Sequence, residues 1–136
     1  MHYNACLNEG LMQRMCDRLL SMAKLSKNDV TDTDFSNAIE KFERAYRLNP
    51  GKAEALSNHA ITLAEWASQK SGLQADELFR AAIAKCDYIL QRNARYYPAL
   101  LCRANAILNW AKQKSGDEAK SLFADSLKAF ERAAQN

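Results

Sequence analysis

The stretch EWASQKSG at residues 65–72 recurs as NWAKQKSG at residues 109–116, which is 44 positions later. Around this pair, residues 55–79 align with residues 99–123 without a gap, and 12 of the 25 positions are identical. A shift of 44 positions in the other direction gives a fainter third copy in the N-terminal part of the chain. Self-similarity at a fixed period is the signature of repeat architectures. The sequence therefore predicts three units of 44 residues.

Each unit has the pattern of two amphipathic helices joined by a tight turn. In residues 53–70, apolar residues recur at spacings of four, three and four, on one face of a helix: Leu56, Ala60, Leu63 and Ala67. A second stripe of this kind occupies residues 75–90. Gly72 ends the first stripe and is expected to terminate the first helix, because glycine readily adopts the left-handed backbone of a helix C-terminus. Ser71 and Gln74 also match a capping box, so two ways of building the joint stay open.

These units predict an all-α fold in a single domain, residues 1–136. Three antiparallel helical hairpins in series would give six helices in a right-handed superhelical stack, which is a solenoid. Pro50 and Pro98 support the boundaries, since proline ends a helix or occupies its first turn. The expected units are approximately 4–50, 53–94 and 97–136.

The composition excludes several classes of protein. The chain has 19 basic and 16 acidic residues and a formal net charge of +3, which is too balanced to indicate a nucleic-acid partner. The four cysteines are scattered, without the spacing of a zinc site or a disulfide framework, so we expect no metal and no cofactor. Free thiols favour a reducing compartment, and the localisation expected from them is cytoplasmic. The sequence shows neither a signal peptide nor a long apolar run, so no membrane contact is expected.

The segment FSNAIEKFERAYRLNPGKAEAL, residues 35–56, resembles the second helix and following turn of a tetratricopeptide repeat. Ala38, Phe42, Ala45 and Pro50 stand at the spacing of that family. The period of that family is 34 residues, and about ten more residues lie around the joint here. The resemblance implies stacked helical hairpins whose first helices line a concave, peptide-binding face. Plant mitochondrial import receptors are similar in having lengthened repeats, although they carry a membrane anchor that we do not expect in this sequence.

Projecting the concave face of that family onto this sequence gives a set of candidate peptide-binding residues. They combine amides, acids and aliphatic side chains, which favours a neutral to mildly basic peptide. The set is Gln13, Asp17, Ser57, Asn58, Ile61, Glu65, Leu101, Asn105 and Asn109.

Other functions find weaker support in the sequence. Trp66 and Trp110 could be stacking platforms for a ligand, but aromatic residues at helical spacing usually belong to a core, here the seam between hairpins. A thiol-dependent activity through Cys16 or Cys102 would need a base nearby, and His59 is the sole candidate outside the N-terminal tail. No nucleotide-binding or metalloprotease motif is present, so we expect no enzyme and no catalytic residue.

The sequence thus predicts a non-enzymatic scaffold that binds a protein or peptide segment on its concave face. A targeting-sequence receptor is a narrower form of the same hypothesis. The alternative is a structural module that self-associates through its uncapped terminal helices, because solenoids usually need a polar cap at their ends. RNA binding through a related helical code is the weakest of these hypotheses, given the near-neutral charge.

Overall fold

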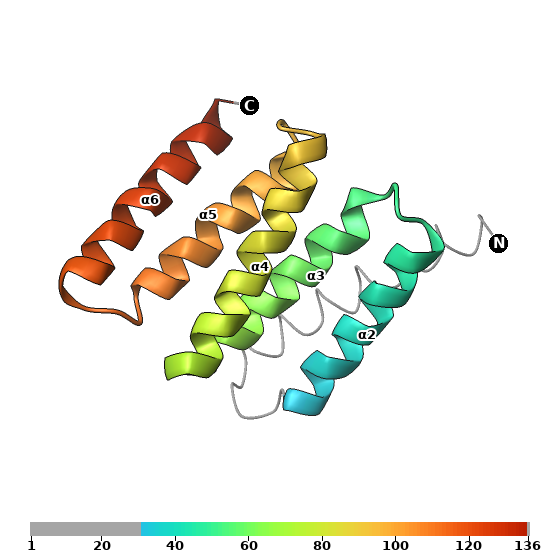
Figure 1. Ribbon diagram of the computed structural model, residues 1–136, viewed down its shortest axis with the longest axis horizontal. Coiled ribbons are helices and arrows are strands. Elements are labelled where there is room, and N and C mark those ends of the chain that lie inside the picture. The colour runs from blue at the N-terminus through green and yellow to red at the C-terminus, as the bar shows by residue number, and fades with distance from the viewer. Residues whose placement is uncertain (1–30, 136) are drawn as a thin grey trace.

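The computed structural model describes residues 31–135, and this part of the chain contains five α-helices and no strand. Successive helices run antiparallel and lie side by side in chain order (Figure 1). The helices are α2 (Asp32–Leu48), α3 (Ala53–Ser68), α4 (Gly72–Arg92), α5 (Tyr97–Ala111) and α6 (Gly116–Ala134). The predicted all-helical class is confirmed for these residues. The sixth helix, expected around Gln13 and Asp17, falls outside them, and the right-handed superhelix and division into units stay predictions.

The helix ends follow from local sequence signals. At the start of α2, the Thr31 side chain accepts a hydrogen bond from the Asp34 amide while the Asp34 carboxylate accepts one from the Thr31 amide, which completes a capping box. Proline occupies the first turn of α5, where its missing N–H costs nothing. Local sequence thus fixes where these helices begin, before any contact with the rest of the chain is considered.

The two Ser-Gly joints use glycine for its backbone freedom. Gly72 and Gly116 have φ angles of 60° and 61°, in the left-handed region that disfavours residues with a Cβ. Ser71 and Ser115 precede them as N-cap residues, but neither side chain makes a capping hydrogen bond. The left-handed backbone of both glycines is therefore confirmed, but each glycine begins the following helix instead of ending the preceding one, and the side-chain capping box is not formed.

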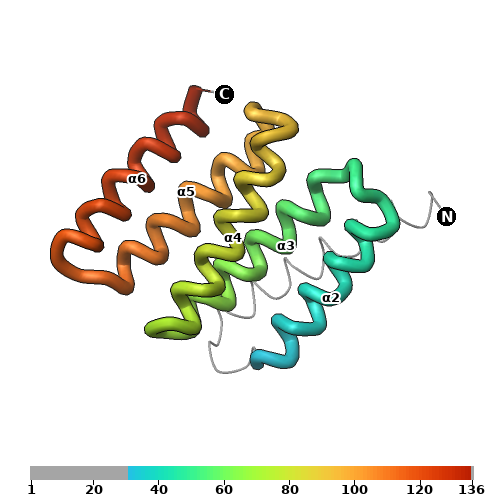
Figure 2. Tube along the Cα trace, in the orientation of Figure 1, coloured from blue at the N-terminus to red at the C-terminus, as the bar shows by residue number. Residues whose placement is uncertain are grey.

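The helices form two layers. The first layer consists of α3 and α5, whose backbones lie next to each other, and the second consists of α2, α4 and α6. Within the described residues, the backbone of α4 is not an immediate neighbour of the backbone of α2 or of α6. The tube in Figure 2 follows the same alternation from one layer to the other along the chain. We call α3 and α5 the inner layer and α2, α4 and α6 the outer layer.

The core lies between these layers and combines buried phenylalanines of α2 and α4 with many alanines. Phe35 and Phe42 of α2 and Phe79 and Cys86 of α4 are each at most 1% exposed. Alanines at the facing positions are equally buried, which lets neighbouring helices approach closely. Cys86 accordingly fills a packing position, as expected for a small apolar side chain.

Candidate peptide-binding site

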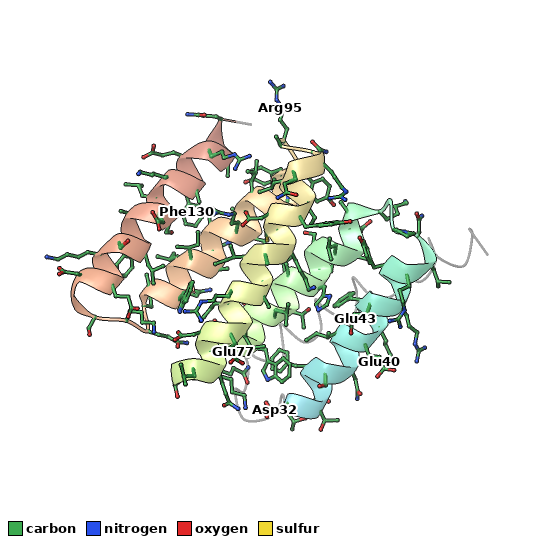
Figure 3. The ribbon with its side chains drawn as sticks, in the orientation of Figure 1. Asp32, Glu40, Glu43, Glu77, Arg95 and Phe130 are labelled. Carbon is green, nitrogen blue, oxygen red and sulfur yellow. The ribbon has the colours of Figure 1, made fainter. Side chains whose placement is uncertain are left out.

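The repeated Trp-Ala-x-Gln-Lys-Ser-Gly motif forms a structural joint between hairpins. Trp66 of α3 stacks on Phe35 of α2 with ring centroids 5.8 Å apart. The Trp66 Nε1 donates a hydrogen bond of 2.9 Å to Asp32 Oδ1, and Lys70 Nζ donates one of 2.8 Å to Asp32 Oδ2. In Figure 3, Asp32 lies in the first turn of α2, at the end of the molecule where α4 also begins.

The second joint has the same construction one period later. Trp110 stacks on Phe79 at 5.9 Å, its Nε1 donates to Asp76 Oδ1 at 2.8 Å, and Lys114 Nζ donates to Asp76 Oδ2 at 3.2 Å. Gln113 adds a hydrogen bond to the Ala67 carbonyl of the preceding unit. The polar edge and one ring face of both tryptophans are thus occupied within the fold. This confirms that the tryptophans extend the packing seam between hairpins.

The partners of this joint, Asp32 and Asp76, are not evident from hydrophobic periodicity. The signal for them is their separation, which is the same 44 positions that separate the tryptophans and the lysines. The hydrogen bond from Trp110 and then that from Lys114 lower the pKa of Asp76, whereas Lys70 and then Trp66 lower the pKa of Asp32. Both carboxylates therefore stay charged at neutral pH and act as fixed acceptors.

A separate hollow of about 530 Å³ lies between the two helices of the inner layer. Its walls combine apolar side chains with two amides and a single charged group among the described residues, the carboxylate of Glu65. We call this hollow the inner groove. It is lined by Ile61, Ala64, Glu65, Tyr97, Pro98, Leu101, Cys102, Asn105 and Asn109.

The inner groove brings together more than half of the predicted binding residues. The five that line it are Ile61, Glu65, Leu101, Asn105 and Asn109. Ser57 and Asn58 do not line it, because their side chains are buried in α3 at 2% and 4% exposure. The Ser57 hydroxyl and the Asn58 amide nitrogen have no hydrogen-bond partner among residues 31–135, which is costly for buried polar atoms. Gln13 and Asp17 lie outside the described residues.

Four further residues of the inner groove are absent from the predicted set, and one of them is Cys102. Ala64 comes from α3, and Tyr97 and Pro98 come from the first turn of α5. Tyr97 precedes Leu101 by four positions, which is the spacing of neighbours on one helix face. This spacing is the signal that could have identified Tyr97, because Leu101 was already in the set.

The groups that a thiol-dependent activity would need are buried. Cys102 is 6% exposed and Cys86 is fully buried, whereas Cys16 lies outside the described residues. Burial, followed by the positive charge of Lys85, lowers the pKa of His59 to about 4, so its imidazole is neutral at physiological pH. Within residues 31–135, no group of three or more His, Cys, Asp or Glu side chains could hold a metal ion. The same part of the chain contains no helix long and apolar enough to span a membrane.

Antiparallel helices in series, two joints of the same construction and a groove lined by α3 and α5 define a helical, repeat-like protein. The profile of the family described as "Plant specific mitochondrial import receptor subunit TOM20" matches residues 9–136. The chain belongs to this family. No curated protein and no solved structure matches the chain significantly.

The family corrects one prediction and supports others in coarse form. The cytoplasmic localisation predicted from the free cysteines is wrong, because the family is one of mitochondrial import receptor subunits. The physical reason is that reduced thiols report the redox state around a protein and carry no information on the organelle at which it works. A receptor subunit is a non-enzymatic protein that interacts with other proteins, which agrees with the predicted class of function.

Proposed function

We propose that this chain is a receptor that binds an amphipathic, basic targeting segment in the inner groove. Mitochondrial transit peptides are amphipathic and rich in Arg and Ser, with few acidic residues. An amphipathic helix binds by placing its apolar face in a hydrophobic groove. The composition of the inner groove carries the proposal: Leu101, Ile61 and Tyr97 offer an apolar surface, and Glu65 is the one charged side chain that the described residues place along it.

The polar groups of the inner groove complement such a segment. Glu65 favours a basic side chain over an acidic one, and the amides of Asn105 and Asn109 can each both donate and accept hydrogen bonds. The volume of about 530 Å³ fits a few side chains of a bound peptide and is within the range of ordinary ligand sites. Binding would therefore depend on one apolar face of the segment and would tolerate variation elsewhere in its sequence.

The test uses a fluorescein-labelled 15-residue amphipathic peptide of Arg, Ser and Leu, whose affinity is measured by fluorescence anisotropy. We expect Leu101→Ala to weaken binding about tenfold, because it removes an apolar contact from the wall of the groove. Leu73→Ala is the matched control, since Leu73 is 79% exposed and lies outside the groove. An equal loss from both variants would contradict the assignment of the inner groove.

A second pair of variants tests the polar wall. Asn105→Ala should weaken binding about threefold to fivefold, and Asn37→Ala on the exposed side of α2 should leave it unchanged. Circular dichroism should show that all variants keep their helical content. A peptide with Glu in place of Arg should bind more weakly than the basic peptide, because it meets the carboxylate of Glu65.

Self-association is a second candidate function, supported by the exposed apolar surface of α6. Phe123 and Leu127 are 44% and 61% exposed, whereas Phe79, one period before Phe123, is fully buried under Trp110. A second copy of the chain could cover this surface. Multi-angle light scattering across concentration should then show a mass above that of the monomer, and Leu127→Lys should reduce it. A monomer mass at all concentrations would contradict self-association.

A further inference from the structure

A second groove lies in the outer layer, between α2 and α4. The backbones of these two helices are not immediate neighbours, and Leu56 of α3 forms the floor between them. Three adjoining hollows share Tyr46 and Leu56, and the two larger ones have volumes of about 520 and 460 Å³. We call this surface the outer groove. Its central wall consists of Tyr46, Leu56, Ala81, Ala84, Lys85 and Tyr88, and it shares no residue with the inner groove.

Two tyrosines connect the walls of the outer groove. The Tyr46 hydroxyl donates a hydrogen bond of 3.0 Å to the Tyr88 hydroxyl, and the rings meet edge to face at 6.5 Å. This hydrogen bond is also the main reason that the pKa of Tyr46 is raised. The Arg92 guanidinium lies 3.8 Å from the centroid of the Tyr88 ring. Tyrosine and arginine that remain partly exposed beside a hollow are the side chains enriched at protein interfaces.

The charge of the outer groove is opposite to that of the inner groove. Among the described residues, four basic and two acidic side chains border its three hollows: Lys52, Arg47, Lys85, Arg92, Glu43 and Glu54. Figure 3 shows Glu43 on α2. His59 adds no charge at neutral pH, because its pKa is lowered to about 4. Lys85 is half-buried at the centre of the groove, with no ion pair to another described residue. A basic targeting segment would be repelled here.

The two tyrosines of the outer groove have no counterpart in the other repeats. One period from Tyr46 stands Leu90, and one period from Tyr88 stands Arg44 or Arg132. By contrast, the Trp, Asp and Lys of the joints are preserved between units because the fold uses them twice. The two tyrosines of the outer groove are therefore specific to the space between α2 and α4, whereas Leu56 and Lys85 recur one period away as Leu100 and Lys41.

We propose that the outer groove binds an acidic segment of a partner protein, independently of the inner groove. An apolar side chain of the segment occupies the hollow between Tyr46, Leu56 and Ala84, and its carboxylates lie against Lys85 and Arg92. The charge complementarity and the apolar floor together select this occupant over a basic or purely polar segment. One chain would then hold a basic segment in its inner layer and an acidic segment in its outer layer at the same time.

The probe for this site is a fluorescein-labelled 15-residue peptide of Glu, Leu and Phe, with a Lys-for-Glu version of the same apolar pattern as its counterpart. We expect the acidic peptide to bind and Lys85→Glu to weaken it at least tenfold. Lys112→Glu is the matched control, because it changes the net charge equally at an exposed position outside the groove. Lys85→Gln gives the same test with a smaller change, should Lys85→Glu fail to fold. Tyr88→Ala should weaken the acidic peptide about fivefold.

The remaining measurements distinguish this site from the inner groove, from a general anion site and from self-association. A saturating amount of the basic peptide should leave the acidic peptide bound, and Leu101→Ala should not change the affinity for the acidic peptide. Both results would show that the acidic peptide binds independently of the inner groove. The proposal is overturned if Lys112→Glu weakens binding as much as Lys85→Glu. It is also overturned if the acidic peptide does not bind or if a 15-nucleotide oligo-dT displaces it, since the surface would then be a general anion site. Chain self-association that excludes the peptide would overturn it as well.

Discussion

The two joints share their chemistry and differ in their surroundings. At the first joint, the Asp32 side chain is 64% exposed, whereas at the second the Asp76 side chain is 12% exposed. The second joint also receives Glu118, which lies 3.7 Å from Lys114, and Arg80, whose guanidinium lies 5.4 Å from the Trp110 ring centroid. The same residues at the same spacing should therefore contribute unequally to stability. A repeat thus preserves contacts, while the burial of each contact sets its contribution to stability.

Removal of the tryptophans should give the largest effects. We expect Trp110→Ala to lower the free energy of unfolding by about 3 kcal/mol and Trp66→Ala by about 2 kcal/mol, because each loses a ring that stacks on a buried phenylalanine. The loss of unfolding free energy should be larger for Trp110→Ala. This change also removes the ring beneath the Arg80 guanidinium and takes a hydrogen-bond donor from the more buried Asp76. Urea denaturation followed by circular dichroism measures both. A larger loss of stability for Trp66→Ala would contradict the inference that the more buried joint contributes more.

The joints were predictable from the sequence to the extent that they repeat. The period of 44 residues, together with the helical spacing of the aromatic residues, predicts that Trp66 and Trp110 lie in the seam between hairpins. The aspartates that complete the joint required knowledge of which helix ends meet, although their own spacing of 44 was visible. Physical contact across a repeat boundary is a tertiary property that hydrophobic periodicity within one helix does not encode.

The inner groove was predictable only in part, and α3 shows why. This helix contacts α2, α4 and α5, so most of its circumference is buried. A polar residue on such a helix is exposed only where no neighbour covers it. Ile61 and Glu65 fall on the uncovered side, whereas Ser57 and Asn58 do not. The outer groove was not anticipated, because its two tyrosines do not recur with the period and its residues are brought together by the space between two helices whose backbones stay apart.

The glycines of the two joints should make equal contributions to stability, in contrast to the tryptophans. Both have φ near 60°, and a Cβ on either would meet no atom within 4 Å. Gly72→Ala and Gly116→Ala should each cost about 1 kcal/mol, from backbone strain alone. Thermal unfolding of the two variants should therefore give equal shifts. Unequal shifts would show that the surroundings act on the turns as well as on the tryptophans, and the contrast between the joints would lie outside the Trp, Asp and Lys contacts.

Removal of a carboxylate charge at either joint should give the smallest change in stability. The pH dependence of this change should be specific to the carboxylate removed. The pKa of Asp76 is lowered, so the stability from its charge is complete above the ordinary value of 3.8 and is lost as the pH falls through the lowered pKa. Asp76→Asn keeps an oxygen for Trp110 but removes the charge that faces Lys114. We therefore expect Asp76→Asn to be less stable than the parent at pH 7, and the gap to close below the lowered pKa. Asp32→Asn should show the same trend with a smaller amplitude, because solvent screens the exposed pair.

A double-mutant cycle separates this charge effect from local strain. Lys114→Met removes the partner of Asp76, and the combination with Asp76→Asn should cost less than the sum of the two single changes. The matched cycle of Asp32→Asn with Lys70→Met should show weaker coupling, since the Asp32 side chain is the more exposed of the two carboxylates. Urea midpoints at pH 7, with and without 1 M NaCl, give both couplings. Equal couplings at the two joints would mean that burial does not decide how much each charge pair stabilises the fold, because salt and solvent would then screen both pairs alike.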